Sequence, residues 1–274
     1  MSYREWAPGE RLREHVLCAW ARHFPDGSDA GAAVVPDACM DVVWTGRTLL
    51  VAGPDTRPAP VVAGPGSGFV GLRFRTGRAP DVLGVPSSVL RDRRVPAADV
   101  WGAPAQRLTQ RLGEAGTAVA QVQLIEAFVA ARLDRDATSA RGSVDAALTQ
   151  GLVGELLRAP QRRVGELAGD LGVGERRLRR HCEAAVGYGP KTLQRVVRFR
   201  RFLHLAERCP GAGLAELALA AGYADQAHLT REARALGGAA PTVLVGSPDP
   251  VVASPVSESF KTGAWTPGQP AGHG

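Results

Sequence analysis

Long apolar stretches are missing from this sequence of 274 residues, and none approaches the roughly 20 residues that a membrane-spanning helix needs. The first residues, MSYREWAPGE, carry charges where a secretory signal has an apolar core. The sequence therefore predicts a cytoplasmic protein with no membrane partner. Cysteine is also scarce, since Cys18, Cys39, Cys182 and Cys209 form no CxxC pair. This argues against a zinc knuckle and favours reduced thiols.

The positive charge is concentrated in one part of the chain, whose net charge is +6. Residues 1–159 contain 18 basic and 17 acidic residues, whereas residues 160–236 contain 14 basic and eight acidic ones. Between Arg176 and Arg208 there are ten basic residues against two acidic ones. This local excess favours a polyanionic partner, although a solvated basic helix face would carry the same charge.

The first hundred residues have a pattern typical of β-structure, in which short apolar segments alternate with Pro, Gly and Asp. The expected strands are His15–Phe24, Ala32–Val35, Asp41–Thr45, Arg47–Ala52 and Phe69–Thr76. From Pro104 onward the apolar residues recur at helical steps. The expected helices are Gln106–Leu112, Ala118–Leu133 and Val144–Leu157. The predicted fold class is α+β, with a mainly β, sandwich- or barrel-like N-terminal domain followed by an all-α domain.

These patterns divide the chain into four parts. We expect a β-rich domain over residues 1–100, a helical connector over 101–142 and a helical domain over 143–246. Residues 247–274 are rich in Pro, Gly and Ser without any period, which predicts a disordered tail.

The helical domain contains one internal repeat. Arg163–Val173 followed by Glu175–Glu183 is echoed by Leu214–Tyr223 followed by Asp225–Arg234. Each unit predicts a short helix centred on Leu-Ala, a glycine turn and a second short helix. The glycine permits the backbone turn, and the alanine lets the two helices approach closely. The pattern is that of a helix-turn-helix motif, present twice.

Residues 190–207, between the two units, predict an amphipathic helix that begins at Pro190. At 100° per residue one face is apolar and the other carries Lys191, Arg195, Arg198 and Arg201. A helix of about 18 residues spans roughly 27 Å. Successive turns of the DNA major groove are about 34 Å apart. One rigid helix can therefore hold two motifs near consecutive grooves on one side of a duplex.

At this point the helical domain resembles the AraC/XylS family of transcriptional regulators. Ala218–Arg231 has an alanine-glycine-aromatic turn followed by Asp-Gln-x-His-x-x-Arg. Leu171–Arg180 and Val186–Lys191 are similar to the first half of the family domain, and the resemblance covers residues 144–245. It implies a double helix-turn-helix domain that binds promoter or operator DNA.

The resemblance extends, more loosely, to the N-terminal part. Residues 1–100 are similar to the sensor domains that precede this module in a subgroup of the family, in Val35–Trp44, Ala52–Thr56 and Gly71–Arg75. This implies a regulatory domain for an effector of unknown identity.

Three features depart from the family pattern. Cys182 and Ala233 stand where the family has phenylalanine, and the closing motif from Gly238 to Pro241 lacks its final arginine. We therefore expect the second unit to pack less firmly than the first.

The candidate DNA-contacting residues fall into three groups. In the first recognition helix Arg176, Arg179 and Arg180 share one face, and arginine suits bidentate contact with guanine as well as with phosphate. The second helix offers Gln226, Ala227, Thr230 and Arg231 at the corresponding places. Lys191, Arg195 and Arg198 are phosphate candidates, whereas Arg200 lies on the apolar side and is expected to make an internal pair.

The N-terminal domain offers weaker candidates. Asp37, Asp41, Arg73 and Arg75 are proposed to line a ligand pocket, with a structural ion pair or a turn as the alternative. No metal site is expected, because Cys18 shares a strand face with Val16 and Trp20, whereas His15 and His23 point the other way.

The function that these observations favour is a sequence-specific transcription regulator that needs no cofactor and is not an enzyme. A Cys39-dependent DNA alkyl-damage repair protein is one alternative, but Asp37 and Asp41 would raise the pKa of that thiol. A non-specific basic DNA-architectural protein is the other. The sequence leaves open whether the protein forms a homodimer and whether it contacts RNA polymerase.

Overall fold

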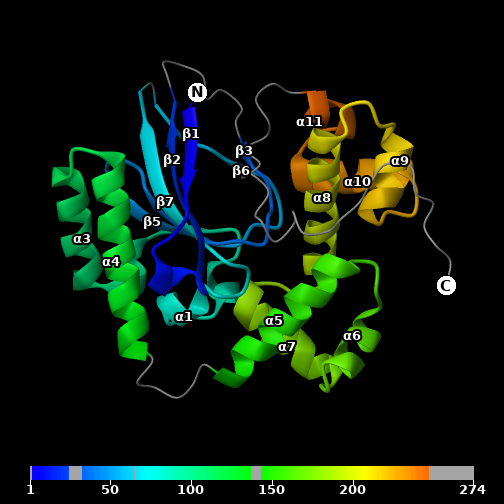
Figure 1. The fold of residues 1–274 in the computed structure, drawn as a ribbon, viewed down its shortest axis with the longest axis horizontal. Coiled ribbons are helices and arrows are strands. Elements are labelled where there is room, and N and C mark those ends of the chain that lie inside the picture. The colour runs from blue at the N-terminus through cyan, green and yellow to red at the C-terminus, as the bar shows by residue number, and fades with distance from the viewer. Residues whose placement is uncertain (1, 25–32, 65, 137–142, 247–274) are drawn as a thin grey trace.

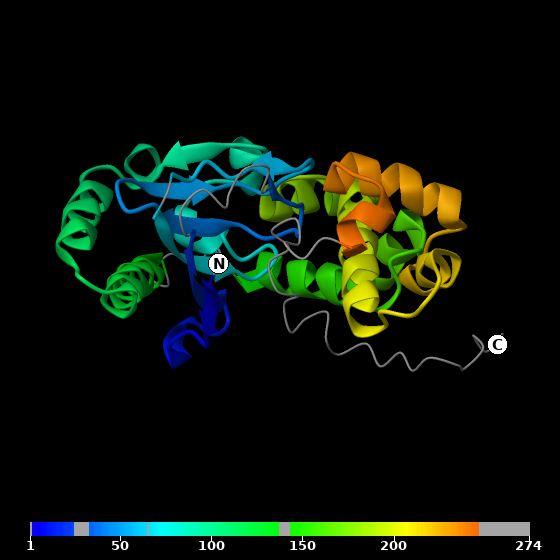
Figure 2. The same cartoon turned by 90° about the horizontal axis from the view of Figure 1, so that it is seen from above.

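The computed structural model describes residues 2–24, 33–64, 66–136 and 143–246. These form a β-rich N-terminal domain and a helical C-terminal domain that lie side by side (Figures 1 and 2). The α+β class expected from the sequence is therefore confirmed. The expected tail, residues 247–274, lies outside the described residues. No described helix is both long enough and apolar enough to cross a membrane.

The N-terminal domain is built on a six-stranded sheet in the order β1-β2-β7-β4-β5-β8, with antiparallel pairing throughout. Its strands are β1 (Ser2–Trp6), β2 (Val16–His23), β4 (Asp41–Trp44), β5 (Leu49–Ala52), β7 (Gly68–Phe74) and β8 (Arg94–Pro96). A second, two-stranded sheet pairs β3 (Ala33–Val34) with β6 (Ala59–Pro60). The sequence did not predict β1, β6 and β8, which are edge strands or very short.

Short helical segments connect the strands and two longer helices follow them. They are η1 (Glu10–Leu12), α1 (Pro80–Leu83), η2 (Ser87–Leu90), α2 (Ala97–Trp101), α3 (Ala103–Glu114) and α4 (Ala118–Asp136). Leu112 on α3 and Ile125 on α4 share a buried core with Val42 and Leu72 of the sheet. The helices within residues 101–142, expected as a connector, thus cover one face of the sheet and complete its core (Figure 1).

The face assignment along β2 needs a correction. The pairing of β2 with β7 shifts its register between Val16 and Cys18. Val16 and Ala19, three residues apart, consequently belong to the same core, which a regular strand does not allow. The Cys18 Sγ atom instead lies 3.5 Å from Glu5 Oε1. The expectation that Cys18 shares a face with Val16 is therefore wrong, because the irregular residue reverses the alternation.

The C-terminal domain consists of helices around one apolar core. They are α5 (Ser143–Arg158), α6 (Val164–Asp170), α7 (Glu175–Val186), α8 (Pro190–Arg208), α9 (Leu214–Ala221), α10 (Gln226–Gly237) and α11 (Pro241–Gly246). Helix α8 runs through the middle of this domain and has buried residues all round its axis, such as Leu193, Phe199 and Phe202. Within α8 the exposed residues are Lys191, Glu207 and Arg208. The amphipathic helix expected from the sequence is thus the central support of the domain (Figure 1).

The two domains share part of their packing. Val35 and Ala38, which precede β4, belong to the buried cluster of the helical domain rather than to the core of the sheet. Ser87 of η2 donates a buried hydrogen bond of 2.8 Å to the carbonyl oxygen of Ala185, in the last turn of α7. The N-terminal domain therefore completes the helical core and holds the end of α7.

Candidate DNA-binding interface

The first repeat unit folds as a helix, a tight turn and a second helix. Helix α6 ends at Asp170, and the turn passes through Gly172, whose φ of 65° is a left-handed conformation that favours glycine. After it, the Val173 N–H donates to the Ala168 carbonyl at 2.9 Å. Ala168 is buried, as the close approach of the two helices requires.

The second unit repeats this geometry bond for bond. Helix α9 ends at Ala221, the next residue Gly222 has a φ of 93°, and the Tyr223 N–H donates to the Ala218 carbonyl at 2.9 Å. Ala218 is fully buried. The side chain of Asp225 then caps α10 by accepting a 2.6 Å hydrogen bond from the His228 N–H. Both repeats identified in the sequence are thus helix-turn-helix motifs in the structure.

The three arginines proposed on α7 all point to solvent. Arg176, Arg179 and Arg180 are exposed, while Leu178 and Cys182 on the opposite side are buried. Nε of Arg179 is 2.9 Å from Glu183 Oε1, but 73 % of its side chain remains exposed. Helix α7 therefore presents a basic face that is open to a partner.

The residues proposed on α10 form a smaller exposed surface. Gln226, Ala227 and Arg231 are exposed, and Arg231 supplies the positive charge among them. The hydroxyl of Thr230 donates to the Gln226 carbonyl at 2.8 Å within the helix, so its hydrogen is already used. Arg231 is thus the charged group among the residues proposed on this helix.

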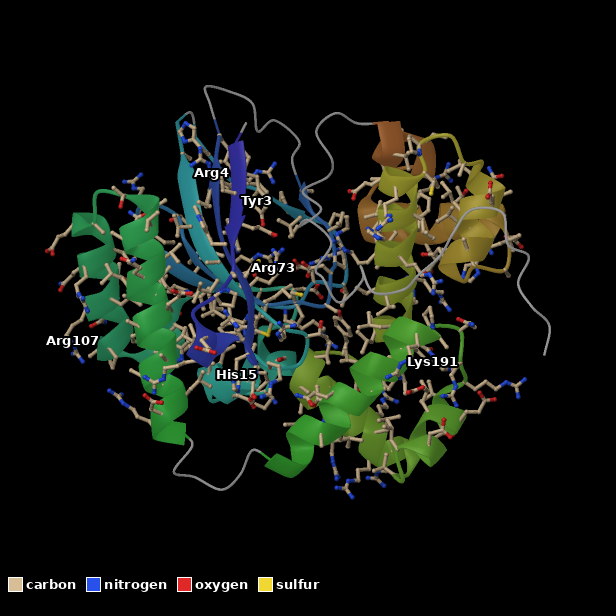
Figure 3. All side chains as sticks on the ribbon, in the orientation of Figure 1. Tyr3, Arg4, His15, Arg73, Arg107 and Lys191 are labelled. Carbon is tan, nitrogen blue, oxygen red and sulfur yellow. The ribbon has the colours of Figure 1, made fainter. Side chains whose placement is uncertain are left out.

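The three phosphate candidates on α8 occupy different environments. Lys191 is exposed in the first turn of the helix (Figure 3). Nε of Arg195 instead lies 2.9 Å from Glu232 Oε2 on α10, with 40 % of the arginine side chain exposed. The Arg198 guanidinium lies 5.7 Å from the centre of the Tyr223 ring, over the turn of the second motif. Arg195 and Arg198 therefore fasten α8 to the second motif, and only Lys191 is fully presented to solvent.

Sequence reasoning passed over two exposed basic residues. Arg177 on α7 and Arg234 on α10 are both exposed and lie beside the proposed sets. The charge count between Arg176 and Arg208 already includes Arg177. Glu232 was also missed as the partner of Arg195, because the two residues are far apart in sequence and only the fold brings them together.

Arg200, expected to make an internal pair, is 1 % exposed and lies at the boundary between the domains. Burial lowers the pKa of its guanidinium, whereas Asp37 of the N-terminal domain acts in the opposite direction. The neighbouring Tyr188, also 1 % exposed, has its pKa raised by burial and by the charge of Asp37. The internal environment of Arg200 is thus formed partly by the other domain.

The proposed ligand residues of the N-terminal domain divide into two sets. Arg73 forms two hydrogen bonds with Asp41, of 3.0 and 2.8 Å, and its Nε lies 3.7 Å from Asp37 Oδ2. Burial alone would lower the pKa of Arg73, but Asp41 and Asp37 outweigh it and raise that pKa above its usual value. Figure 3 places Arg73 on the side of the sheet that faces α8. Arg75 lies apart, with its Nε donating to the Arg13 carbonyl at 2.7 Å. Three of the four residues therefore form a buried ion cluster.

The thiol of Cys39 is not activated for nucleophilic chemistry. Burial raises its pKa well above the usual value, and the negative charge of Asp37 raises it further. Thiolate, the reactive form, is therefore disfavoured at neutral pH. Within the described part of the chain, no group of three or more His, Cys, Asp and Glu side chains is arranged to hold a metal ion.

Comparison with known proteins gives two family matches. A helix-turn-helix domain family matches residues 167–245, and a domain of unknown function (DUF6597) matches residues 4–96. No curated protein matches the sequence significantly.

Solved structures of ToxT resemble the chain at low identity. ToxT from Vibrio cholerae O395 is 10 % identical, with a TM-score of 0.44 over 83 % of this chain and 96 % of that protein. Wild-type ToxT from strain SCE256, solved with a bound unsaturated fatty acid, is 8 % identical, with a TM-score of 0.44 over 82 % of this chain and 90 % of that protein.

A helix-turn-helix domain behind a β-sheet domain defines a DNA-binding transcription regulator. The matched domains, in this order, identify the chain as a regulator of the AraC/XylS type.

Proposed function

We propose that the chain is a sequence-specific regulator that reads two successive major-groove segments of duplex DNA with α7 and α10. The main support for the proposal is that the two motifs have the same turn geometry and that both present exposed arginine. Each has the same turn, closed by a 2.9 Å hydrogen bond back to a buried alanine, and each is followed by a helix with an exposed arginine face.

The spacing of the motifs supports the same proposal. Helix α8 has 19 residues, and such a helix is about 28 Å long. It joins the two motifs as one continuous support, so that they move together. Two recognition helices that dock one helical turn of DNA apart, 10–10.5 bp, need a rigid connection of this order.

The roles of the helices follow from their surfaces. Arg176, Arg179 and Arg180 supply base and phosphate contacts from α7, since arginine can donate two hydrogen bonds to guanine O6 and N7. Arg231 is the base contact of α10, with Gln226 and Ala227 beside it. Lys191 contacts a phosphate between the two grooves.

The experiment is selection from randomised duplex DNA by the full chain, followed by Arg180→Ala and a matched control. Arg107→Ala removes an arginine of α3 that is also exposed, on the other side of the molecule from Lys191 (Figure 3). A bidentate contact discriminates by about 1–3 kcal/mol, so Arg180→Ala should lose about five- to 150-fold in affinity and relax one or two base pairs of one half-site. Arg107→Ala should leave both unchanged.

Three results would contradict the proposal. Selection that yields no preferred sequence would make the chain a non-specific DNA-binding protein. If Arg180→Ala and Arg107→Ala lost the same affinity for DNA, the loss would come from the change in net charge and not from a specific contact. If Arg231→Ala relaxed the same base pairs as Arg180→Ala, the two helices would not read separate segments.

A further inference from the structure

One short loop of the N-terminal domain contacts the C-terminal ends of both α7 and α10. It is Gly53–Pro58, between β5 and β6, and is called the brace loop below. At α7 the contact is made by Pro54, which is buried. The cap residue Gly187 has a φ of 98°, and a Cβ atom at this position would overlap Pro54 Cγ and lie 3.3 Å from the Ser87 carbonyl oxygen. The end of α7 therefore has no free space on this side.

The second contact repeats the arrangement at α10. The cap residue Gly238 has a φ of 76°, and a Cβ atom built on it would lie 3.3 Å from Pro58 Cγ and 3.9 Å from Pro58 Cβ. Each helix thus ends at a left-handed glycine against a proline of the same loop. Because Pro54 and Pro58 are four residues apart, the two contact points lie within about 14 Å of each other.

The brace loop is itself fixed to the sheet. Asp55, which is 7 % exposed, forms two 2.6 Å hydrogen bonds with Arg94. Thr56 donates to Asp92 through its backbone N–H at 2.7 Å and through its hydroxyl at 2.8 Å. The Gly53 N–H donates to the Arg93 carbonyl at 2.9 Å. A loop held at so many points cannot swing without breaking buried polar contacts.

We propose that the brace loop sets the distance and angle between α7 and α10, and so determines which half-site spacing the protein accepts. This inference rests on the proposed function. Helix-turn-helix motifs present the N-terminal residues of their second helix to base edges. The brace loop acts on the opposite ends, where it does not compete with DNA. Pro54 and Pro58 are then specificity-determining residues that touch no nucleotide.

The test measures spacing preference rather than affinity alone. A DNA series built from the selected site carries insertions or deletions of one and two base pairs between the half-sites. The full chain, the double variant Pro54→Ala/Pro58→Ala and the control Pro60→Ala are titrated on each member. Pro60 is an exposed proline of β6 and serves as the matched substitution.

One mismatched base pair typically costs about five- to 150-fold in affinity. We expect a one-base-pair insertion to cost the unaltered chain and Pro60→Ala at least as much. The double variant should retain less than half of this discrimination on a logarithmic scale, with affinity for the optimal site nearly kept. The single variant Pro58→Ala, at a half-buried position beside Gly238 at the end of α10, should show a smaller loosening and tests the proposal even if the double variant fails to fold.

A folded variant with the spacing profile of the unaltered chain would overturn the role of the brace loop and leave the proposed function intact. A selection that finds no two-part site for the unaltered chain would instead overturn the proposed function, before any variant is compared. Both outcomes are read from the same set of titrations.

Discussion

Lys191 and Arg195 look equivalent in the sequence, but the structure predicts different effects on the salt dependence of DNA binding. Lys191 is exposed, whereas Nε of Arg195 is 2.9 Å from Glu232 Oε2 and the glutamate side chain is only 14 % exposed. The prediction compares the variant Lys191→Ala with the double variant Arg195→Ala/Glu232→Ala. The double variant removes a whole ion pair and leaves the net charge unchanged.

The magnitude follows from counterion release. Each phosphate contact contributes about 0.9 to the slope of log K against log salt. Lys191→Ala should therefore reduce the slope by about 0.9, and between 50 and 200 mM salt this amounts to about a 3.5-fold smaller loss of affinity. Arg195 is already neutralised by Glu232, so the double variant should keep the slope. It should still weaken the selected site at every salt concentration, because the pair positions α10.

Fluorescence anisotropy with the selected duplex over a salt series measures both quantities. Glu232→Ala alone is the control for the freed arginine and should raise the slope or leave it unchanged. If the double variant lowered the slope as much as Lys191→Ala, Arg195 would contact a phosphate in the complex, and the positioning role derived from its pair with Glu232 would be refuted.

Two further predictions concern the N-terminal domain. Arg73→Ala leaves Asp41 buried without its cation and should destabilise the protein by about 3–5 kcal/mol at pH 7. Burial already raises the pKa of Asp41, and without Arg73 that pKa rises further. The folded variant therefore takes up a proton as the pH falls from 7 towards 5. Its loss in free energy of unfolding, measured by urea titration against the unaltered chain, should shrink over this range. Val35→Ala should cost about 2 kcal/mol and speed hydrogen exchange in α7 and α8, whereas Val62→Ala, at a valine that is 89 % exposed, should do neither.

The sequence was sufficient to locate the two motifs because their determinants are local. A glycine at a left-handed turn and an alanine at the helix crossing recur in both units, and both are found where the repeat places them. The exposure of the arginines on α7 followed from the helical period around Leu178. Such features need only neighbours within one or two turns of chain.

The contacts between domains could not be predicted in this way. The sequence pattern assigns Val35 and Ala38 to the β domain, but in the structure they are buried in the core of the helical domain. We expect a fragment of residues 140–246 alone to bind DNA, yet it would expose the surface that these residues cover. The affinity of this fragment therefore depends on the lost packing as well as on its DNA contacts. No periodicity in the sequence encodes which loop of one domain fills a gap in another.

The expected weakness of the second motif was inferred from Ala233, which stands where a phenylalanine is usual. The structure places an aromatic ring of another helix close to α10. Ala233 is fully buried, and one turn later a Cβ atom at Gly237 would lie 2.8 Å from the Phe199 ring of α8. Residues four apart share a helix face, and Ala233, Phe199 and Leu244 belong to one buried cluster, so this side of α10 packs against α8 and α11. Together with the Asp225 cap, this gives α10 both packing and a fixed first turn. The absent aromatic on α10 therefore does not by itself imply a loosely held helix, because Phe199 of α8 lies against α10 at Gly237.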